Sequence, residues 1–211
     1  MIAPRATGDS RDGRPIRLLG IGGSTRRGFH SLVALRAALR LGVEAGARTT
    51  WADVRELNLP VYNADLQVAD YPPLLAWLLD EARASDGFIF CSPTYHGTIS
   101  GAVKNVLDAL AFMVSDDPPN LGGKPVGLMG YGGQSAVNVL NTLHHAVHGL
   151  NGHATKTFVA VPSSAFDDRR VDVTEEGVIK RLGTMVNELI EYAALRRLAT
   201  DAAVTSTTTD R

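Results

Sequence analysis

The fold is decided by residues 87–108, which read GFIFCSPTYHGTISGAVKNVLD. The run from Gly87 to Cys91 is short, apolar and bounded by turn residues, as expected of a strand that is covered on both faces. Apolar residues recur at helical spacing from Val103 onward, and Ser100 stands where a helix N-cap is favoured. The sequence between these two elements therefore predicts a strand-to-helix loop.

The chain repeats such strand-and-helix units. Apolar runs that predict strands alternate five times with amphipathic segments that predict helices. The expected strands cover residues 16–21, 48–54, 87–91, 124–130 and 154–161. Such alternation predicts a doubly wound parallel sheet with right-handed crossovers. Five strands favour a flavodoxin-like three-layer α/β sandwich with strand order 2-1-3-4-5, whose ligand crevice lies between the carboxyl ends of strands 1 and 3.

The chain has 211 residues, which suits one domain. We expect this domain over residues 15–199, between a disordered leader at 1–14, which is no secretion signal, and a disordered polar tail at 200–211. The net charge of −1 indicates no nucleic-acid partner, and no apolar run approaches the roughly 18 residues of a membrane span. The single cysteine, Cys91, excludes a disulfide within the chain and fits a reducing, cytoplasmic location.

The loop after the first strand is a candidate phosphate site. Residues 23–28 have the glycine spacing of a P-loop, but Phe29 and His30 replace the required Lys and Ser/Thr, so an NTPase is not indicated. Nor does the loop match the dinucleotide fingerprint of a Rossmann fold. We expect Ser24, Arg26 and Ser31 to donate hydrogen bonds to a phosphate, with His30 as a fourth candidate. Taken alone, the loop is about equally well explained as a solvated turn.

The loop after the third strand is suited to a flat ring. Pro93 restricts the backbone, Tyr95 and His96 offer planar side chains, and Gly97 allows close approach of the main chain to a ligand. Backbone groups of such a loop can contact the polar edge of an isoalloxazine. Singly, Tyr95 and His96 are better explained as a rim aromatic and a surface histidine, but together on this loop they favour a ring site.

Other clusters of polar residues indicate no further chemistry. The three histidines of one expected helix, His144, His145 and His148, fall on its polar face and lack the glutamate of a zinc-protease motif. Asp53 and Asp86 stand at strand edges without an evident partner. We therefore assign no metal site and no catalytic acid or base.

The chain resembles the NADPH-dependent FMN reductase family over about residues 16–195. The resemblance lies in three motifs, Gly23-Ser24-Thr25-Arg26, Leu59-Pro60-Val61-Tyr62 and Pro93-Thr94-Tyr95-His96-Gly97, the last followed by residues 100–108. It implies an oxidoreductase that holds FMN without a covalent bond and takes hydride from NADPH or NADH. A quinone, a free flavin or another small acceptor would then be reduced in a ping-pong cycle.

The resemblance also implies roles for individual residues. Ser24, Arg26 and Ser31 would hold the phosphate, and Pro93, Thr94, Tyr95, His96 and Gly97 would hold the ring, with Gly132 and Gly133 along its other edge. Many relatives carry a serine where this chain has Phe29, which implies that one phosphate hydroxyl is either missing or supplied by Ser31. Relatives usually form dimers or tetramers, which implies a homodimer or a homotetramer.

Two other functions stay open at this point. One is a flavodoxin-like electron carrier without its own NAD(P)H activity, although the near-zero net charge disfavours a protein that docks by electrostatic steering. The other is a partner-binding domain that has the fold but binds no flavin, because a fold does not dictate a function.

Overall fold

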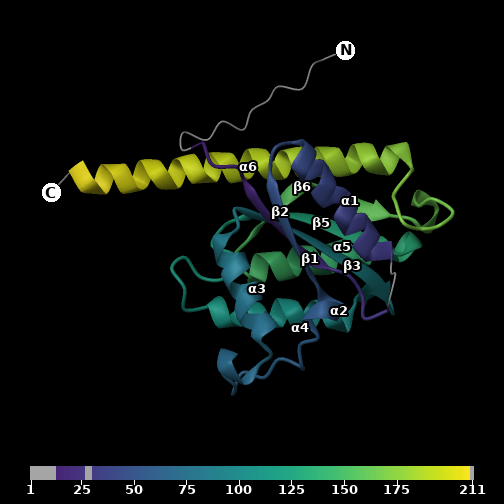
Figure 1. The fold of residues 1–211 in the computed structure, drawn as a ribbon, viewed down its shortest axis with the longest axis horizontal. Helices are drawn as coiled ribbons and strands as arrows, with labels where there is room; N and C mark the ends of the chain where they lie inside the picture. The colour runs from purple at the N-terminus through teal and green to yellow at the C-terminus, as the bar shows by residue number, and fades with distance from the viewer. Residues whose placement is uncertain (1–12, 27–29, 210–211) are drawn as a thin grey trace, which may run out of the picture.

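The computed structural model describes residues 13–26 and 30–209, and it describes side chains as far as Asp201. Arg27 and Phe29 lie outside the described residues, as does nearly all of the expected leader. The parallel strands are β1 (Arg17–Gly22), β2 (Arg48–Asp53), β3 (Gly87–Tyr95), β5 (Pro125–Tyr131) and β6 (His153–Val161). Their order across the sheet is β2-β1-β3-β5-β6, which confirms the predicted flavodoxin-like topology (Figure 1).

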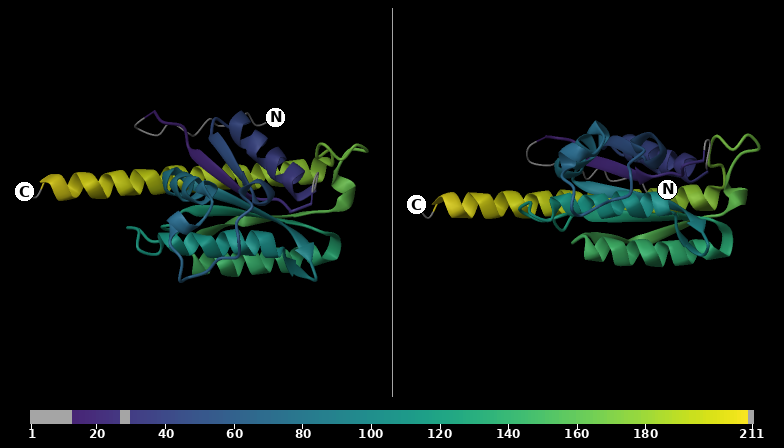
Figure 2. Two further views of the ribbon diagram at one scale, coloured as in Figure 1. Left: turned by 60° about the horizontal axis from the view of Figure 1, so that its bottom comes forward. Right: turned by 90° about the horizontal axis from the view of Figure 1, so that it is seen from below.

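Helices cover both faces of the sheet and make three layers (Figure 2). One face carries α1 (His30–Glu44) and α6 (Glu176–Thr209), and the other carries α3 (Pro73–Ala84), α4 (Gly101–Ala109) and α5 (Ala136–Gly149). Successive residues of a strand point to opposite faces, so Phe88 and Phe90 enter the core under α3, α4 and α5, whereas Ile89 and Cys91 enter the core under α1 and α6. A strand buried on both faces must be apolar throughout, which explains the run that predicted β3.

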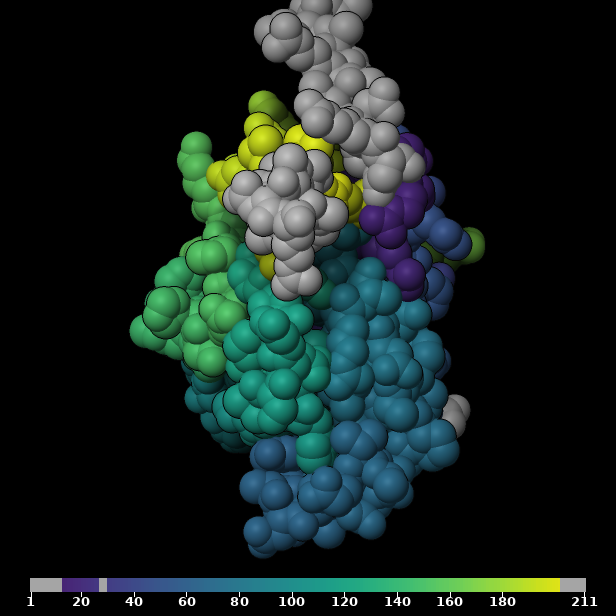
Figure 3. All heavy atoms as spheres, turned by 90° about the vertical axis from the view of Figure 1, so that its left-hand side faces the viewer, coloured from purple at the N-terminus to yellow at the C-terminus, as the bar shows by residue number. Residues whose placement is uncertain are grey.

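Short elements complete the chain. They are the helix α2 (Val54–Leu57) and the 3₁₀ turns η1 (Val68–Asp70), η2 (Leu110–Met113), η3 (Gly133–Ser135) and η4 (Ser163–Ala165). Residues 58–70 lie at the opposite end of the molecule from α6, as Figure 3 shows from the side of the C-terminal end of that helix. Among the described residues, no helix combines the length and the apolar character that crossing a membrane requires.

Strand β3 is four residues longer than the sequence predicts. It continues from Cys91 to Tyr95 and turns back into β4 (Thr98–Ile99), which pairs with it in antiparallel orientation. The two turn residues, His96 and Gly97, both have positive φ, 49° and 82°, as in the type I′ turns that favour tight hairpins. A side chain at Gly97 would meet only Asn138 Nδ2, at 4.0 Å, so the turn explains this glycine without a ligand.

Helix α6 also differs from the expected boundary, because it runs on to Thr209, whereas a polar tail was expected from Thr200. The last glycine of the chain is Gly183 and no proline follows it, so nothing in the sequence forces the helix to end earlier. The C-terminal end of α6 projects beyond the sheet (Figure 1).

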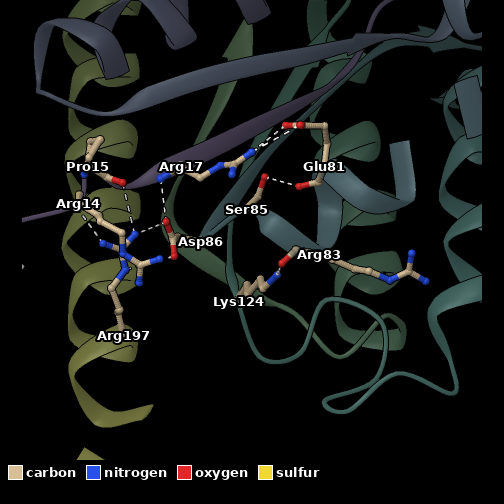
Figure 4. A network of polar contacts seen from close by, with 9 residues as sticks. All are labelled: Arg14, Pro15, Arg17, Glu81, Arg83, Ser85, Asp86, Lys124 and Arg197. Atoms are coloured by element: carbon tan, nitrogen blue, oxygen red, sulfur yellow. Dashed lines mark hydrogen bonds and ion pairs between the residues drawn. The ribbon is translucent and has the colours of Figure 1, made fainter. Parts of the chain in front are cut away.

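An arginine binds helix α6 to the edge of the sheet at which the parallel strands begin. Arg197 forms an ion pair with Asp86, the residue before β3, and its Nη1 donates to the Arg14 carbonyl oxygen at 2.8 Å (Figure 4). Asp86 Oδ2 also accepts a hydrogen bond at 2.8 Å from the backbone N–H of Arg17, the first residue of β1. Asp86, which has no partner evident from the sequence, thus ties two strands to α6.

We expect Arg197→Ala to lower the free energy of unfolding by about 2–3 kcal/mol, because Asp86 would lose its charged partner at a largely buried position. The side chains of Arg197 and Asp86 are only 10% and 22% exposed. Urea unfolding measures the loss, and the exposed Arg169→Ala is the control for removal of one arginine. Equal stability of the two variants would contradict this role of the ion pair.

Candidate functional site

The two loops predicted to converge do meet, at the carboxyl edge of the sheet. Ser24 follows β1 and Tyr95 ends β3, and Ser24 Oγ lies 3.3 Å from the Tyr95 hydroxyl across 71 residues of sequence. Ser24 is buried, and its Oγ also accepts a hydrogen bond at 3.2 Å from the backbone N–H of Arg26. The two candidate loops are therefore parts of one site, at the position where this topology places its ligands.

At the end of β1, the backbone of Gly22 lies close against β3. A Cβ atom on Gly22 would lie 2.3 Å from the Cys91 carbonyl oxygen, so only glycine fits there. The Cys91 thiol donates to the Ser31 carbonyl oxygen at 3.2 Å, and burial raises the pKa of this thiol to about 12. Cys91 is thus a protonated core residue and not a nucleophile.

The first turn of α1 contains a buried serine hydroxyl. Ser31 is fully buried, and none of the described residues hydrogen-bonds with its Oγ. Leaving such a group unsatisfied costs free energy, and a helix N-terminus presents further unpaired backbone N–H donors. An anion with several acceptor oxygens, such as a phosphate, would satisfy these donors together. The residues of this turn therefore fit a phosphate group.

His30 sits beside this turn in an aromatic cluster. Its ring centroid lies 5.1 Å from that of Tyr131 and 5.0 Å from that of Phe166. Its Nε2 lies 3.4 Å from Arg170 Nη1. Burial, together with the positive charges of Arg170 and Arg26, lowers the pKa of His30. The sequence contains no signal that links Tyr131, Phe166 or Arg170 to this loop.

We expect the imidazole of His30 to titrate below pH 6.5 in the folded protein. The unfolded chain then binds the proton more readily, so the free energy of unfolding falls as the pH drops below about 6.5. An NMR titration of the ring gives the midpoint, which Arg170→Ala should move upward by removing a positive charge. Chemical unfolding of His30→Gln should show a weaker pH dependence than wild type. A midpoint at or above pH 6.5 would contradict the expected lowering of the His30 pKa by burial and by the two arginines.

The glycine-rich loop after β5, residues 132–135, is the third loop of the candidate site, and it packs against the second, which follows Cys91 in β3. Thr94 Oγ1 donates to the Tyr131 carbonyl oxygen at 3.0 Å, and Pro93 lies opposite Tyr131 in the sheet. A Cβ atom on Gly132 would lie 2.4 Å from Thr94 Oγ1, whereas one on Gly133 would meet nothing within 4 Å. Gly132 therefore permits the close contact between the loops.

The predicted site residues lie in three places. Ser24 and Arg26 follow β1 beside Tyr95, and His30 and Ser31 form the start of α1. Pro93 and Thr94 contact the third loop, where Gly132 and Gly133 lie. The tip of the β3–β4 hairpin, with His96 and Gly97, instead lies toward α5, where Thr98 Oγ1 is 3.1 Å from Thr142 Oγ1.

An asparagine that the sequence does not single out anchors the segment at residues 59–62. Asn105, on α4, accepts a hydrogen bond from the Tyr62 backbone N–H at 2.7 Å and donates to the Pro60 carbonyl oxygen at 2.8 Å. The ring of Tyr62 packs on that of Phe112, with centroids 5.4 Å apart. The second and third motifs of the resemblance are therefore joined through α4.

No metal chemistry is indicated in the described part of the chain. It contains no group of three or more His, Cys, Asp or Glu residues that could hold a metal ion. His144, His145 and His148 are exposed on α5, as predicted. A surface hollow of about 440 Å³ lies along the edge strand β2, and Trp51, Asp53 and Trp77 are among the residues that line it.

Comparisons with known proteins identify relatives of the chain. The family model described as NADPH-dependent FMN reductase matches residues 16–166. An NAD(P)H-dependent FMN reductase of Pseudomonas aeruginosa is 32% identical over 117 residues, which cover 54% of this chain and 59% of that relative. The match thus spans less than two thirds of the bacterial reductase.

Two further comparisons cover more of the chain. An FMN-dependent NADPH-azoreductase of Staphylococcus saprophyticus is 33% identical over 142 residues, which cover 63% of this chain and 72% of the relative. The solved structure of FerB, a flavoenzyme NAD(P)H:(acceptor) oxidoreductase from Paracoccus denitrificans, matches with a TM-score of 0.66 at 22% identity. That alignment covers 84% of this chain and 97% of FerB, and it shows that the two proteins share a fold.

Proposed function

Because the chain belongs to the NADPH-dependent FMN reductase family, we propose that it is an FMN-dependent NAD(P)H oxidoreductase that reduces a small acceptor such as a quinone or a free flavin. The observation that carries this proposal is the contact between Ser24 and Tyr95. It joins a loop suited to a phosphate with a loop suited to a flat ring, and FMN contains both groups. The buried Ser31 hydroxyl, which no described residue satisfies, supports the same assignment.

The chain's own residues would bind and orient the cofactor. Ser24, Arg26, Ser31 and the backbone N–H groups of the first turn of α1 would hold the phosphate, with His30 beside them. Pro93, Thr94, Tyr95, His96 and Gly97 would border the ring on one side, and Gly132 and Gly133 on the other. When bound, FMN would accept a hydride from NADPH or NADH and pass the electrons to the acceptor in a ping-pong cycle.

No side chain of the site is needed as an acid or a base. The raised pKa keeps the Cys91 thiol protonated, and the lowered pKa keeps His30 neutral near pH 7. The protein would contribute position, exclusion of water and donors for the phosphate. A homodimer or homotetramer and a cytoplasmic location stay predictions from the sequence.

Flavin binding and reduction test the proposal. Purified protein reconstituted with FMN should show flavin absorbance, which NADPH or NADH should bleach in the absence of oxygen. A flavodoxin-like carrier would bind FMN but would leave NADPH unoxidised unless a separate reductase were added. Failure to bind FMN after reconstitution would exclude both flavin functions and favour a flavin-free domain.

A further inference from the structure

The connection between β6 and α6 brings an arginine to the first turn of α1. Arg170 lies 140 residues after His30, yet its Nη1 is 3.4 Å from His30 Nε2. No carboxylate among the described residues forms an ion pair with Arg170, and its side chain is exposed. It also follows the last residue matched by the family model, residue 166.

The local backbone is organised to hold Arg170. The residue has a φ of 56°, a left-handed conformation that is unfavourable for a non-glycine residue. Hydrogen bonds offset this cost: the Arg170 N–H donates to the Asp167 carbonyl oxygen at 2.8 Å. Asp167 Oδ1 accepts from the N–H groups of Val171 and Asp172, at 2.7 and 3.0 Å. The turn is therefore defined by its own polar contacts.

The connection is also docked on α1. Asp172 forms an ion pair with Arg40 of α1 at 2.7 Å, and this pairing lowers the pKa of the carboxyl group. The ring of Phe166 packs on both His30 and Tyr131, with centroids 5.0 and 5.9 Å away. Phe166 further pairs with Val173 in an isolated β-bridge, which closes the connection on itself. Two independent contacts thus fix the position from which Arg170 extends.

Positive charge is concentrated where Arg170 meets α1. Arg26 and Arg170 approach His30 from segments far apart in the sequence, and the charges of both lower its pKa. The N-terminal end of α1 adds the positive end of a helix dipole, and the buried Ser31 Oγ has no partner among the described residues. Two guanidinium groups at a helix N-terminus are suited to a phosphate, because each can donate two parallel hydrogen bonds to its oxygens.

We propose that Arg170 acts with Arg26 to bind a phosphate monoester at the first turn of α1, and that it determines specificity for phosphorylated ligands. This inference rests on the proposed function, which supplies two ligands with such a group. They are the 5′-phosphate of FMN, to which the first turn of α1 is assigned above, and the 2′-phosphate of NADPH. Riboflavin and NADH are the matching ligands that lack these phosphates.

The test compares Arg170→Ala with Arg169→Ala, which removes the same charge from the neighbouring exposed position. Apoprotein is titrated with FMN and with riboflavin by flavin fluorescence, and KM is measured for NADPH and for NADH. We expect Arg170→Ala to weaken FMN binding by about tenfold and to change riboflavin binding by less than about twofold. Arg170→Lys should recover part of the loss, since it keeps the charge but not the paired donors.

The two arms identify the phosphate. A selective loss of FMN affinity supports the inference and assigns Arg170 to the 5′-phosphate. A selective rise of the KM for NADPH would instead assign Arg170 to the 2′-phosphate and would overturn its joint role with Arg26. If Arg170→Ala matches Arg169→Ala in both arms while wild type binds FMN, the inference is overturned and the proposed function stands. If wild-type apoprotein binds neither flavin, the inference and the proposed function are both overturned.

Discussion

Gly22→Ala is expected to cost at least about 4 kcal/mol of folding free energy and so to remove most of the stability of a typical domain. The added Cβ would lie 2.3 Å from the carbonyl oxygen of Cys91 and 3.1 Å from its carbonyl carbon. These are backbone atoms of β3, which pairs with β1 at this position in the centre of the sheet. Neither strand can move away without breaking hydrogen bonds of the ladder, and the same movement would separate the two loops of the site.

Gly183→Ala provides the matched control. Gly183 lies within α6, and a Cβ atom there would meet nothing within 4 Å. Because alanine is favoured over glycine in a helix, this variant should gain up to about 1 kcal/mol. Urea unfolding compares the two, with circular dichroism to report whether Gly22→Ala folds at all. A Gly22→Ala protein within about 1 kcal/mol of wild type would show that the strands can separate more easily than the structure indicates.

Gly132→Ala is expected to cost about 3 kcal/mol and to weaken FMN binding at least tenfold. Its Cβ would lie 2.4 Å from Thr94 Oγ1 and 2.7 Å from Thr94 Cβ, and the φ of 137° is unfavourable for any residue with a side chain. Relief of the clash would displace the third loop from the second. The hydrogen bond from Thr94 to the Tyr131 carbonyl oxygen would be lost in the same movement.

The neighbouring Gly133→Ala separates the clash from the backbone effect. Gly133 also has a positive φ, 52°, but a Cβ atom there would meet nothing within 4 Å. Only the left-handed conformation is then penalised, by about 1 kcal/mol. Urea unfolding and FMN titration of the two variants give the comparison. Equal losses of stability and of FMN affinity in the two variants would contradict the inference that the close contact with Thr94 requires glycine at position 132.

Parts of the structure were predictable because their signals are local. The strands were expected from short apolar runs and the helices from the spacing of apolar residues. Ser100 was expected to cap α4, and its Oγ does accept the Val103 N–H, at 3.2 Å. The hairpin of β3 and β4 was not expected, because His96-Gly97 is not one of the typical type I′ dipeptides.

Some features of the candidate site were likewise predictable from the sequence, and others were not. The loops after β1 and β3 were expected to converge because the topology of a doubly wound sheet requires it, and Ser24 and Tyr95 do meet. The anchoring of residues 59–62 by Asn105 had no signal, since one asparagine on a helix is ordinary. Nor could the burial of the Ser31 hydroxyl be read from the sequence.

The amino-acid sequence by itself determined the order of strands and helices, the parallel sheet and the edge at which a ligand would bind. These follow from periodicity within short windows and from the handedness of the chain. Only the tertiary structure decided that Arg197 holds Asp86 and that Arg170 reaches His30. Such pairs join residues more than 100 positions apart, and no local pattern couples them, because their proximity arises only when the whole sheet has formed.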